Sequence, residues 1–186
     1  MVLTIDIGNT TIGIGGFQGN KLPFIEKISS RRPLSYAGYI EKLNMILNKH
    51  GLSAEAFEGS MISSVVPSVT AVFSSALETF LGRKPLILSH KLDLGYEICT
   101  EFPEKVGCDR LADIAGAISR YSLPFVTIDL GTATTFNVLD ENRRFLGGLI
   151  LPGVGTAHRA LLGKTAQLPK GDIHMPAHTI GANTQE

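Results

Sequence analysis

The sequence has few cysteines, no excess charge and no long apolar run, and each absence excludes a class of protein. Its 186 residues include two cysteines, Cys99 and Cys108, whose spacing forms neither a zinc motif nor a redox motif. Basic and acidic residues balance at 17 each, so overall charge gives no reason to expect a nucleic acid or an acidic membrane as partner. The apolar runs are too short to span a bilayer and no signal peptide is recognisable, so we expect a cytoplasmic protein.

One motif occurs twice. Residues 4–11 (TIDIGNTT) and 127–135 (TIDLGTATT) each place an Asp and then a Gly at the end of an apolar run, and Asp129 follows Asp6 by 123 positions. This pattern predicts a buried strand that ends in a tight turn, where the Gly lets the backbone approach a ligand closely. A single copy could be an ordinary turn stabilised by its Asp. The near-duplication favours two related halves that offer carboxylates, N–H groups and hydroxyls to one ligand, and a polyphosphate with its metal ion fits that description.

Hydrophobic periodicity predicts that both halves begin with the same order of elements, three strands and then a helix. In the first half we expect strands at 2–7, 12–17, 22–28, 61–66 and 86–88, and helices at 36–51, 68–81 and 106–121. In the second half we expect strands at 125–129, 134–139 and 144–151, and a helix at about 156–162. The sequence therefore predicts an α/β protein with two domains, residues 1–121 and 122–186.

A second cluster of polar side chains opens the helix predicted at 106–121. Gly107-Cys108-Asp109-Arg110 places a carboxylate and a guanidinium at a helix N-terminus, where free N–H groups favour an anion. Asp109 could accept a proton from a substrate hydroxyl, and Arg110 could bind a carboxylate or phosphate through two hydrogen bonds. An N-terminal Asp beside a surface Arg would look the same in sequence.

A third segment, residues 147–156 (GGLILPGVGT), is rich in glycine and precedes a predicted helix. Its glycines would let the backbone lie against a flat or charged ligand, but structural turns explain the spacing equally well. The five histidines share no spacing typical of metal ligands.

Six motifs in this order resemble the type III pantothenate kinase family. They are Asp6–Thr10 (DIGNT), Ile62–Pro67 (ISSVVP), Gly107–Arg110 (GCDR), Asp129–Thr135 (DLGTATT), Gly147–Gly153 (GGLILPG) and Gly181–Thr184 (GANT), and together they cover essentially the whole chain. The resemblance implies the fold of the acetate-and-sugar-kinase, Hsp70 and actin superfamily. In that fold two duplicated ribonuclease-H-like domains with mixed sheets clasp ATP between them.

The resemblance also implies an activity, the ATP-dependent phosphorylation of the 4′-hydroxyl of pantothenate, which is the first step of coenzyme A synthesis. It implies Asp109 as proton acceptor and a pantothenate pocket, at a homodimer interface, that includes Gly107, Cys108, Asp109, Arg110 and Thr184. Asp129 would hold a monovalent cation, K⁺ or NH₄⁺, and Mg²⁺ would accompany ATP with Asp6 as a candidate ligand. The residues implied at ATP are Asp6, Ile7, Gly8, Asn9, Thr10, Thr11, Ile12, Gly13 and Thr132.

The chain departs from the family pattern in two places. Thr100 stands where family members often have a Tyr that contributes to the pantothenate pocket, and Tyr96 is a nearby substitute. Family members also run on past the motif that contains Thr184, so we expect an incomplete second domain with apolar surface that further helices would cover.

Two other functions stay open at this point. A non-catalytic relative of the Bvg accessory factor type would act in transcriptional regulation, and an actin-like ATPase would change shape or polymerise. The presence of Asp6, Asp109, Arg110 and Asp129 together favours the kinase.

Overall fold

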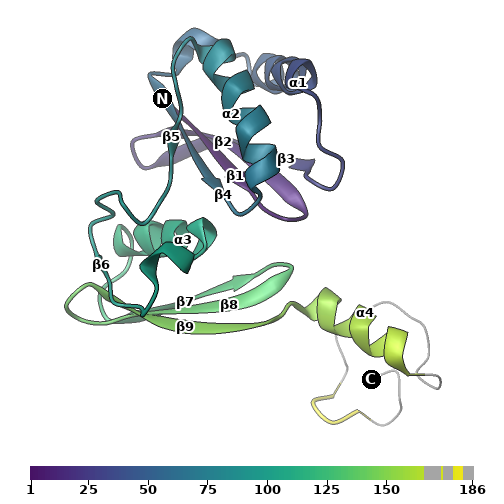
Figure 1. The fold of residues 1–186 in the computed structure, drawn as a ribbon, viewed down its shortest axis with the longest axis vertical. Helices are drawn as coiled ribbons and strands as arrows, with labels where there is room; N and C mark the ends of the chain where they lie inside the picture. Colours follow the sequence, from purple (N-terminus) through teal and green to yellow (C-terminus); the bar gives the residue numbers. More distant parts are fainter. Residues whose placement is uncertain (166–172, 174–177, 182–186) are drawn as a thin grey trace.

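The computed structural model describes residues 1–165, 173 and 178–181, and it contains two β-sheets with a helix between them (Figure 1). The first sheet consists of β1 (Val2–Ile7), β2 (Thr11–Gln18), β3 (Lys21–Ser29), β4 (Gly59–Ser64) and β5 (Leu86–Ile87). The second consists of β6 (Glu97–Ile98), β7 (Phe125–Leu130), β8 (Ala133–Leu139) and β9 (Arg144–Pro152). The helices are α1 (Tyr36–Lys49), α2 (Pro67–Leu81), α3 (Cys108–Ile118) and α4 (Val154–Lys164), with short 3₁₀ turns at Ala54–Ala56 and Pro103–Lys105.

The two sheets repeat one arrangement, as the duplicated motif predicts. The first sheet has the order β3-β2-β1-β4-β5 and the second has the order β6-β9-β8-β7. β1, β2 and β3 form an antiparallel meander, and β7, β8 and β9 form another. Since β1 also pairs in parallel with β4, both sheets are mixed, and β6 pairs in parallel with β9. This confirms the predicted fold class.

The first sheet has a complete core on one face. Side chains alternate along β1, so that Leu3, Ile5 and Ile7 are buried under α1 and α2 while Thr4 and Asp6 point to the opposite face. α1 begins where predicted, because the Ser35 hydroxyl accepts a hydrogen bond from the Gly38 N–H and caps the helix.

The second sheet is covered on one face only, within the part of the chain that the structure describes. α3 packs on the face that carries the buried side chains of Leu139 and Phe145, with Ile114 at the contact. The other face carries the side chains of Val126, Ile128 and Leu130, which are 53%, 56% and 75% exposed. α4 follows β9 and extends away from the end of the second sheet (Figure 1).

Three element boundaries differ from the prediction. The helix expected at 106–121 is α3, Cys108–Ile118, because a separate 3₁₀ turn at Pro103–Lys105 precedes it. The strand expected at 61–66 is β4, Gly59–Ser64, and Pro67 begins α2, since proline is well tolerated in the first turn of a helix. β6 was not predicted, because two residues carry no periodic signal. No helix among the described residues is long and apolar enough to cross a membrane.

Candidate active site

The first Asp–Gly turn (residues 6–11) and the second Asp–Gly turn (residues 129–134) meet. The hydroxyl oxygens of Thr10 and Thr132 lie 3.0 Å apart and share a hydrogen bond. Each turn closes in a similar way, with the Gly8 N–H donating to the Thr11 carbonyl and the Gly131 N–H donating to the Ala133 carbonyl, both at 2.9 Å. The two sheets therefore present similar tight turns to one location.

Carboxylates from three elements line one cavity of about 370 Å³ between the sheets, which we call the central cavity. Asp6 comes from the end of β1 and Asp129 from the end of β7. Asp109 and Asp113 lie one helical turn apart on α3, so their side chains share one face of that helix. The sequence analysis named the first three of these residues, and the structure brings them together.

Asp113 was missed by the sequence analysis, although its spacing of four residues from Asp109 was a usable signal. Burial, together with the nearby charges of Asp129, Asp109 and Asp6, raises its pKa to about 6, against a smaller opposing effect of Arg110. Burial also raises the pKa of Asp6, to which the charges of Asp109 and Asp129 contribute. The carboxylates thus repel one another, and the cavity favours a cation or a proton.

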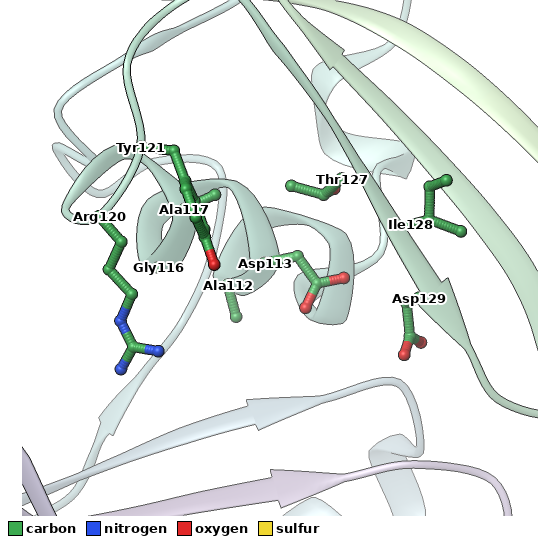
Figure 2. A pocket seen from close by; sticks show the side chains of 9 residues that line it. All are labelled: Ala112, Asp113, Gly116, Ala117, Arg120, Tyr121, Thr127, Ile128 and Asp129. Atoms are coloured by element: carbon green, nitrogen blue, oxygen red, sulfur yellow. The ribbon is translucent and has the colours of Figure 1, made fainter.

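Asp113 also lines a second cavity of about 370 Å³, the outer cavity, which runs along α3 beside β7. Figure 2 shows the carboxylates of Asp113 and Asp129 both pointing into the space in front of the first sheet, with Arg120 at the far end of α3. The two cavities share Ala112, Asp113 and Asp129, so they adjoin at these carboxylates.

Asp109 sits in the first turn of α3 and is held there by the backbone. One of its carboxylate oxygens accepts a hydrogen bond of 2.8 Å from the Arg110 N–H, and Gly107 is the N-cap residue. A side chain at position 107 would crowd that carboxylate, since a Cβ there would lie 2.5 Å from Asp109 Oδ1. The glycine of this motif therefore leaves room for the carboxylate.

Arg110 points toward the second sheet. Its Nε donates to the Asn137 side-chain oxygen at 2.6 Å and its Nη2 donates to the Phe136 carbonyl at 3.3 Å. Asn137 is fully buried and donates in turn to the Thr127 hydroxyl at 2.9 Å. A side chain at Gly148 on the neighbouring strand would overlap the Phe136 carbonyl, so this close approach requires glycine.

The remaining residues named for the pantothenate pocket or beside it differ in their surroundings. The Cys108 thiol donates to the Leu88 carbonyl at 3.1 Å, and burial raises its pKa. The Tyr96 hydroxyl donates to the Leu111 carbonyl at 2.9 Å, which ties it to the backbone of α3. Within the part of the chain that the structure describes, the Thr100 hydroxyl is buried without a hydrogen-bond partner. Thr184 lies outside the described residues.

The side chains of the residues predicted to contact ATP differ in their exposure to solvent. Ile7 and Ile12 belong to the buried core, so only their backbone groups could reach a ligand, whereas Asn9, Thr11 and Thr132 are exposed. The glycine-rich segment lies against the second turn, since the N–H of Gly153 and the hydroxyl of Thr156 both donate to the Thr132 carbonyl. The N-terminus of α4 therefore adjoins the place where the two turns meet.

The chemistry of these side chains fits hard cations. Carboxylate and hydroxyl oxygens are the ligands that Mg²⁺ and similar ions prefer, and the mutual repulsion of the carboxylates would fall when a cation binds. Among the described residues, however, no three His, Cys, Asp or Glu side chains are arranged to hold a metal ion. A cation at Asp6 or Asp129 would therefore need oxygens from other groups, such as water or phosphate.

Comparison with solved structures agrees with the fold expected from the sequence. The chain is similar to a protein from Campylobacter jejuni described as a conserved Baf family transcriptional activator, with a TM-score of 0.57 and 17% identity over 98% of this chain and 69% of that one. It is also similar to a protein described as an N-acetylglucosamine kinase from Porphyromonas gingivalis, with a TM-score of 0.50 and 17% identity over 92% of this chain and 59% of that one. At these identities the likeness supports the actin-like ATPase fold alone.

Sequence comparison is more specific. Residues 2–186 match the profile of the family described as type III pantothenate kinase. A type III pantothenate kinase of Bifidobacterium animalis is 39% identical over 186 residues, which is all of this chain and 74% of that protein. Another, from Thermomicrobium roseum, is 36% identical over 186 residues and 72% of its length. The chain therefore belongs to the type III pantothenate kinase family.

Proposed function

We propose that the protein transfers the γ-phosphoryl group of ATP to the 4′-hydroxyl of pantothenate, in the cytoplasm, as the first step of coenzyme A synthesis. The observation that carries this proposal is the family match over residues 2–186, in a chain whose two Asp–Gly turns share a hydrogen bond. The relatives cited above are type III pantothenate kinases by name. Four of the six motifs that resemble the family each contribute one residue to the lining of the central cavity, namely Asp6, Ser63, Asp109 and Asp129.

In this proposal the two turns receive the phosphates of ATP. Backbone and side-chain groups of residues 6–13 contact them from one side, and Thr132 contacts the nucleotide from the other. A Mg²⁺ ion at Asp6 and a K⁺ or NH₄⁺ ion at Asp129 would supply positive charge for the phosphates. The carboxylates support this assignment, because a polyanion enters an acidic cavity readily only in company with cations.

Pantothenate then binds at the N-terminus of α3, in contact with Gly107, Cys108, Asp109, Arg110 and Thr184. Asp109 orients the 4′-hydroxyl for in-line attack on the γ-phosphorus and accepts its proton late in the reaction. Because phosphoryl transfer passes through a loose transition state, positioning and charge neutralisation contribute most of the rate. The fixed position of Asp109 in the first turn of the helix supports this role.

Residues 1–121 and 122–186 are proposed to be the two ribonuclease-H-like domains, and the active form is proposed to be a homodimer with the pantothenate pocket at its interface. Both proposals derive from the family resemblance. Sedimentation of the purified chain tests the second, since a monomer that is active at all concentrations would contradict it.

Release of ADP from ATP, measured with and without pantothenate, tests the proposed function. The assay contains Mg²⁺ and K⁺, and a pantothenate-dependent rate together with the appearance of 4′-phosphopantothenate is expected. ADP release that does not depend on pantothenate would indicate an ATPase instead. No turnover under any cation condition, with the fold intact by circular dichroism, would favour a non-catalytic regulator.

A further inference from the structure

A row of three residues crosses the first sheet at the level of Asp6. Asp6 on β1 pairs with Gly13 on β2, and Gly13 pairs in turn with Lys27 on β3. Residues directly opposite one another in antiparallel strands place their side chains on the same face of the sheet. Lys27 therefore shares the face of Asp6. This face lines the central cavity, to which Asp6, Gly13 and Ile25 all contribute.

The strand between Asp6 and Lys27 carries no side chain at this level. Among the described residues, a Cβ placed on Gly13 would have only the Asp6 Cβ within 4 Å beyond its chain neighbours, at 3.8 Å. Glycine inside a strand often marks a place where a ligand approaches the backbone closely. Neighbouring strands lie about 4.8 Å apart, so the Cα atoms of Asp6 and Lys27 are separated by about 10 Å. This distance leaves room for a small anion between the two side chains.

The positive charge of Lys27 is not neutralised by an ion pair. Lys27 is exposed and forms no ion pair within the part of the chain that the structure describes. Its neighbour Glu26 points to the opposite face of the strand, since side chains alternate. The Glu26 carboxylate is hydrogen-bonded there to Lys49 and His50, at 2.7 and 2.8 Å. The Lys27 ammonium is therefore available to a ligand.

The charge of Lys27 acts on the carboxylates of the central cavity. Burial raises the pKa of Asp6 and the charges of Asp109 and Asp129 add to this effect, whereas the charge of Lys27 opposes it. A phosphate group that enters the cavity meets the same carboxylates and is repelled by them. A cation on the protein itself, beside a bare stretch of strand, would offset part of that repulsion.

We infer that Lys27 binds the terminal phosphate of ATP, an inference that rests on the proposed function. The terminal phosphate must lie beside Asp109, because that carboxylate is proposed to orient the attacking hydroxyl. Asp109 and Gly13 line the same cavity. α3, which carries Asp109, contacts β4, whereas β2 and β3 lie on the other side of β1. A phosphate above β1 and β2 would thus have Asp109 on one side and Lys27 on the other.

This arrangement gives Lys27 a role in the transfer step as well as in binding. Charge on the oxygens of the transferred phosphoryl group must be neutralised in the loose transition state. An ammonium group binds phosphate as a point charge and needs no fixed geometry of paired donors. Lys27 would therefore hold the γ-phosphate in the ground state and continue to neutralise it during transfer.

Nucleotide titration tests the inference. The 186-residue chain and its Lys27→Met variant are titrated by calorimetry with a non-hydrolysable ATP analogue and with ADP, in Mg²⁺ and without pantothenate. Methionine keeps most of the apolar stem and removes the charge. We expect affinity for the analogue to fall about tenfold or more and affinity for ADP to fall less than about threefold. Lys27→Arg keeps the charge and should bind the analogue within about threefold of wild type.

Lys21→Met is the matched control. Lys21 is an exposed lysine on the same strand and the same face, at the opposite end of β3 from the first Asp–Gly turn. Its Cα lies about 20 Å from that of Lys27, since each residue of a strand adds about 3.3 Å. Its replacement lowers the net charge equally and should change both affinities by less than about twofold, because exposed charges at such a distance are screened.

Three results would overturn the inference: unchanged binding by Lys27→Met, equal losses for the analogue and ADP, or equal losses in Lys27→Met and Lys21→Met. Failure of the proposed function is a separate result. Pantothenate-dependent turnover by wild type, together with unchanged binding by Lys27→Met, overturns the inference alone. A selective loss of analogue binding in a protein without pantothenate-dependent turnover supports Lys27 as the phosphate ligand and rejects pantothenate as the acceptor. A wild-type chain that binds neither nucleotide overturns both.

Discussion

Arg110 and Asn137 are joined by a hydrogen bond of 2.6 Å, from the guanidinium Nε to the buried side-chain oxygen. This bond connects the helix that carries Asp109 to the strand that follows the second Asp–Gly turn. The orientation of Asp109, the proposed proton acceptor, is therefore coupled to the position of the second turn through this hydrogen bond. Burial lowers the pKa of Arg110, but the group stays charged at any physiological pH.

Removal of this link should destabilise the protein. Arg110→Lys cannot reproduce the paired donors, so Asn137 would be left without its partner, at a cost of about 1–3 kcal/mol in the free energy of unfolding. Urea unfolding of Arg110→Lys, Asn137→Ala and the double variant measures the coupling between the two residues. We expect the two losses to be clearly less than additive, and simple additivity would contradict the link.

Asp109→Asn tests the proposed proton acceptor. The amide keeps the shape of the side chain but cannot accept the proton, so we expect kcat to fall by about 10²–10⁴ while the Kd for ATP is unchanged. The measurements are pantothenate-dependent ADP release and calorimetric titration with ATP. Asp93→Asn, in an exposed loop, is the control and should leave both values unchanged. Wild-type turnover of Asp109→Asn would remove this carboxylate from the mechanism.

Asp113 should make stability depend on pH. Its pKa of about 6 in the folded state exceeds the ordinary value of 3.8, so the folded protein binds more protons than the unfolded chain between these values. Its contribution to stability is therefore fully present below about pH 4 and is lost as the pH rises through 6. Asp113→Asn removes the buried charge and should stabilise the protein at pH 7.5 by about 1–3 kcal/mol, with little effect at pH 4.

Urea unfolding of wild type and Asp113→Asn at both pH values checks this sign. Asp6 acts in the same direction, because its pKa is raised by the same causes, so a residual pH dependence is expected in the variant. An equal change at pH 4 and pH 7.5 would show that Asp113 acts through packing and not through its charge.

Replacement of glycine by alanine should have opposite effects on stability at two positions. A Cβ at Gly148 would overlap the Phe136 carbonyl, so Gly148→Ala must displace a strand and should cost about 1–3 kcal/mol of stability. A Cβ at Gly116 meets nothing, so Gly116→Ala should stabilise α3 by about 0.5–1 kcal/mol. Thermal unfolding of the two variants makes the comparison, and equal effects would contradict the described approach of Gly148 to β8.

The fold and part of the site could be predicted from the sequence because their signals are local. Alternating apolar residues and an Asp–Gly pair identify each strand and turn, and duplication of the motif indicates that Asp6 and Asp129 serve one location. The spacing of Asp113 from Asp109 indicates a shared helix face. The cavity that Asp113 lines and the pairing of Arg110 with Asn137 could not be predicted, because both depend on how α3 lies between the sheets. That placement arises from contacts between residues far apart in the chain, which a pattern along one segment does not record.

The outer edge of β7 has a practical consequence for handling the protein. Within the described residues this strand pairs with β8 alone, so a row of backbone donors and acceptors lies open beside the exposed side chains of Val126, Ile128 and Leu130. Such an edge is a template to which a strand of another molecule can add. Recovery of soluble material should therefore depend on dilution, and concentrated stocks are expected to lose protein to strand-mediated aggregation.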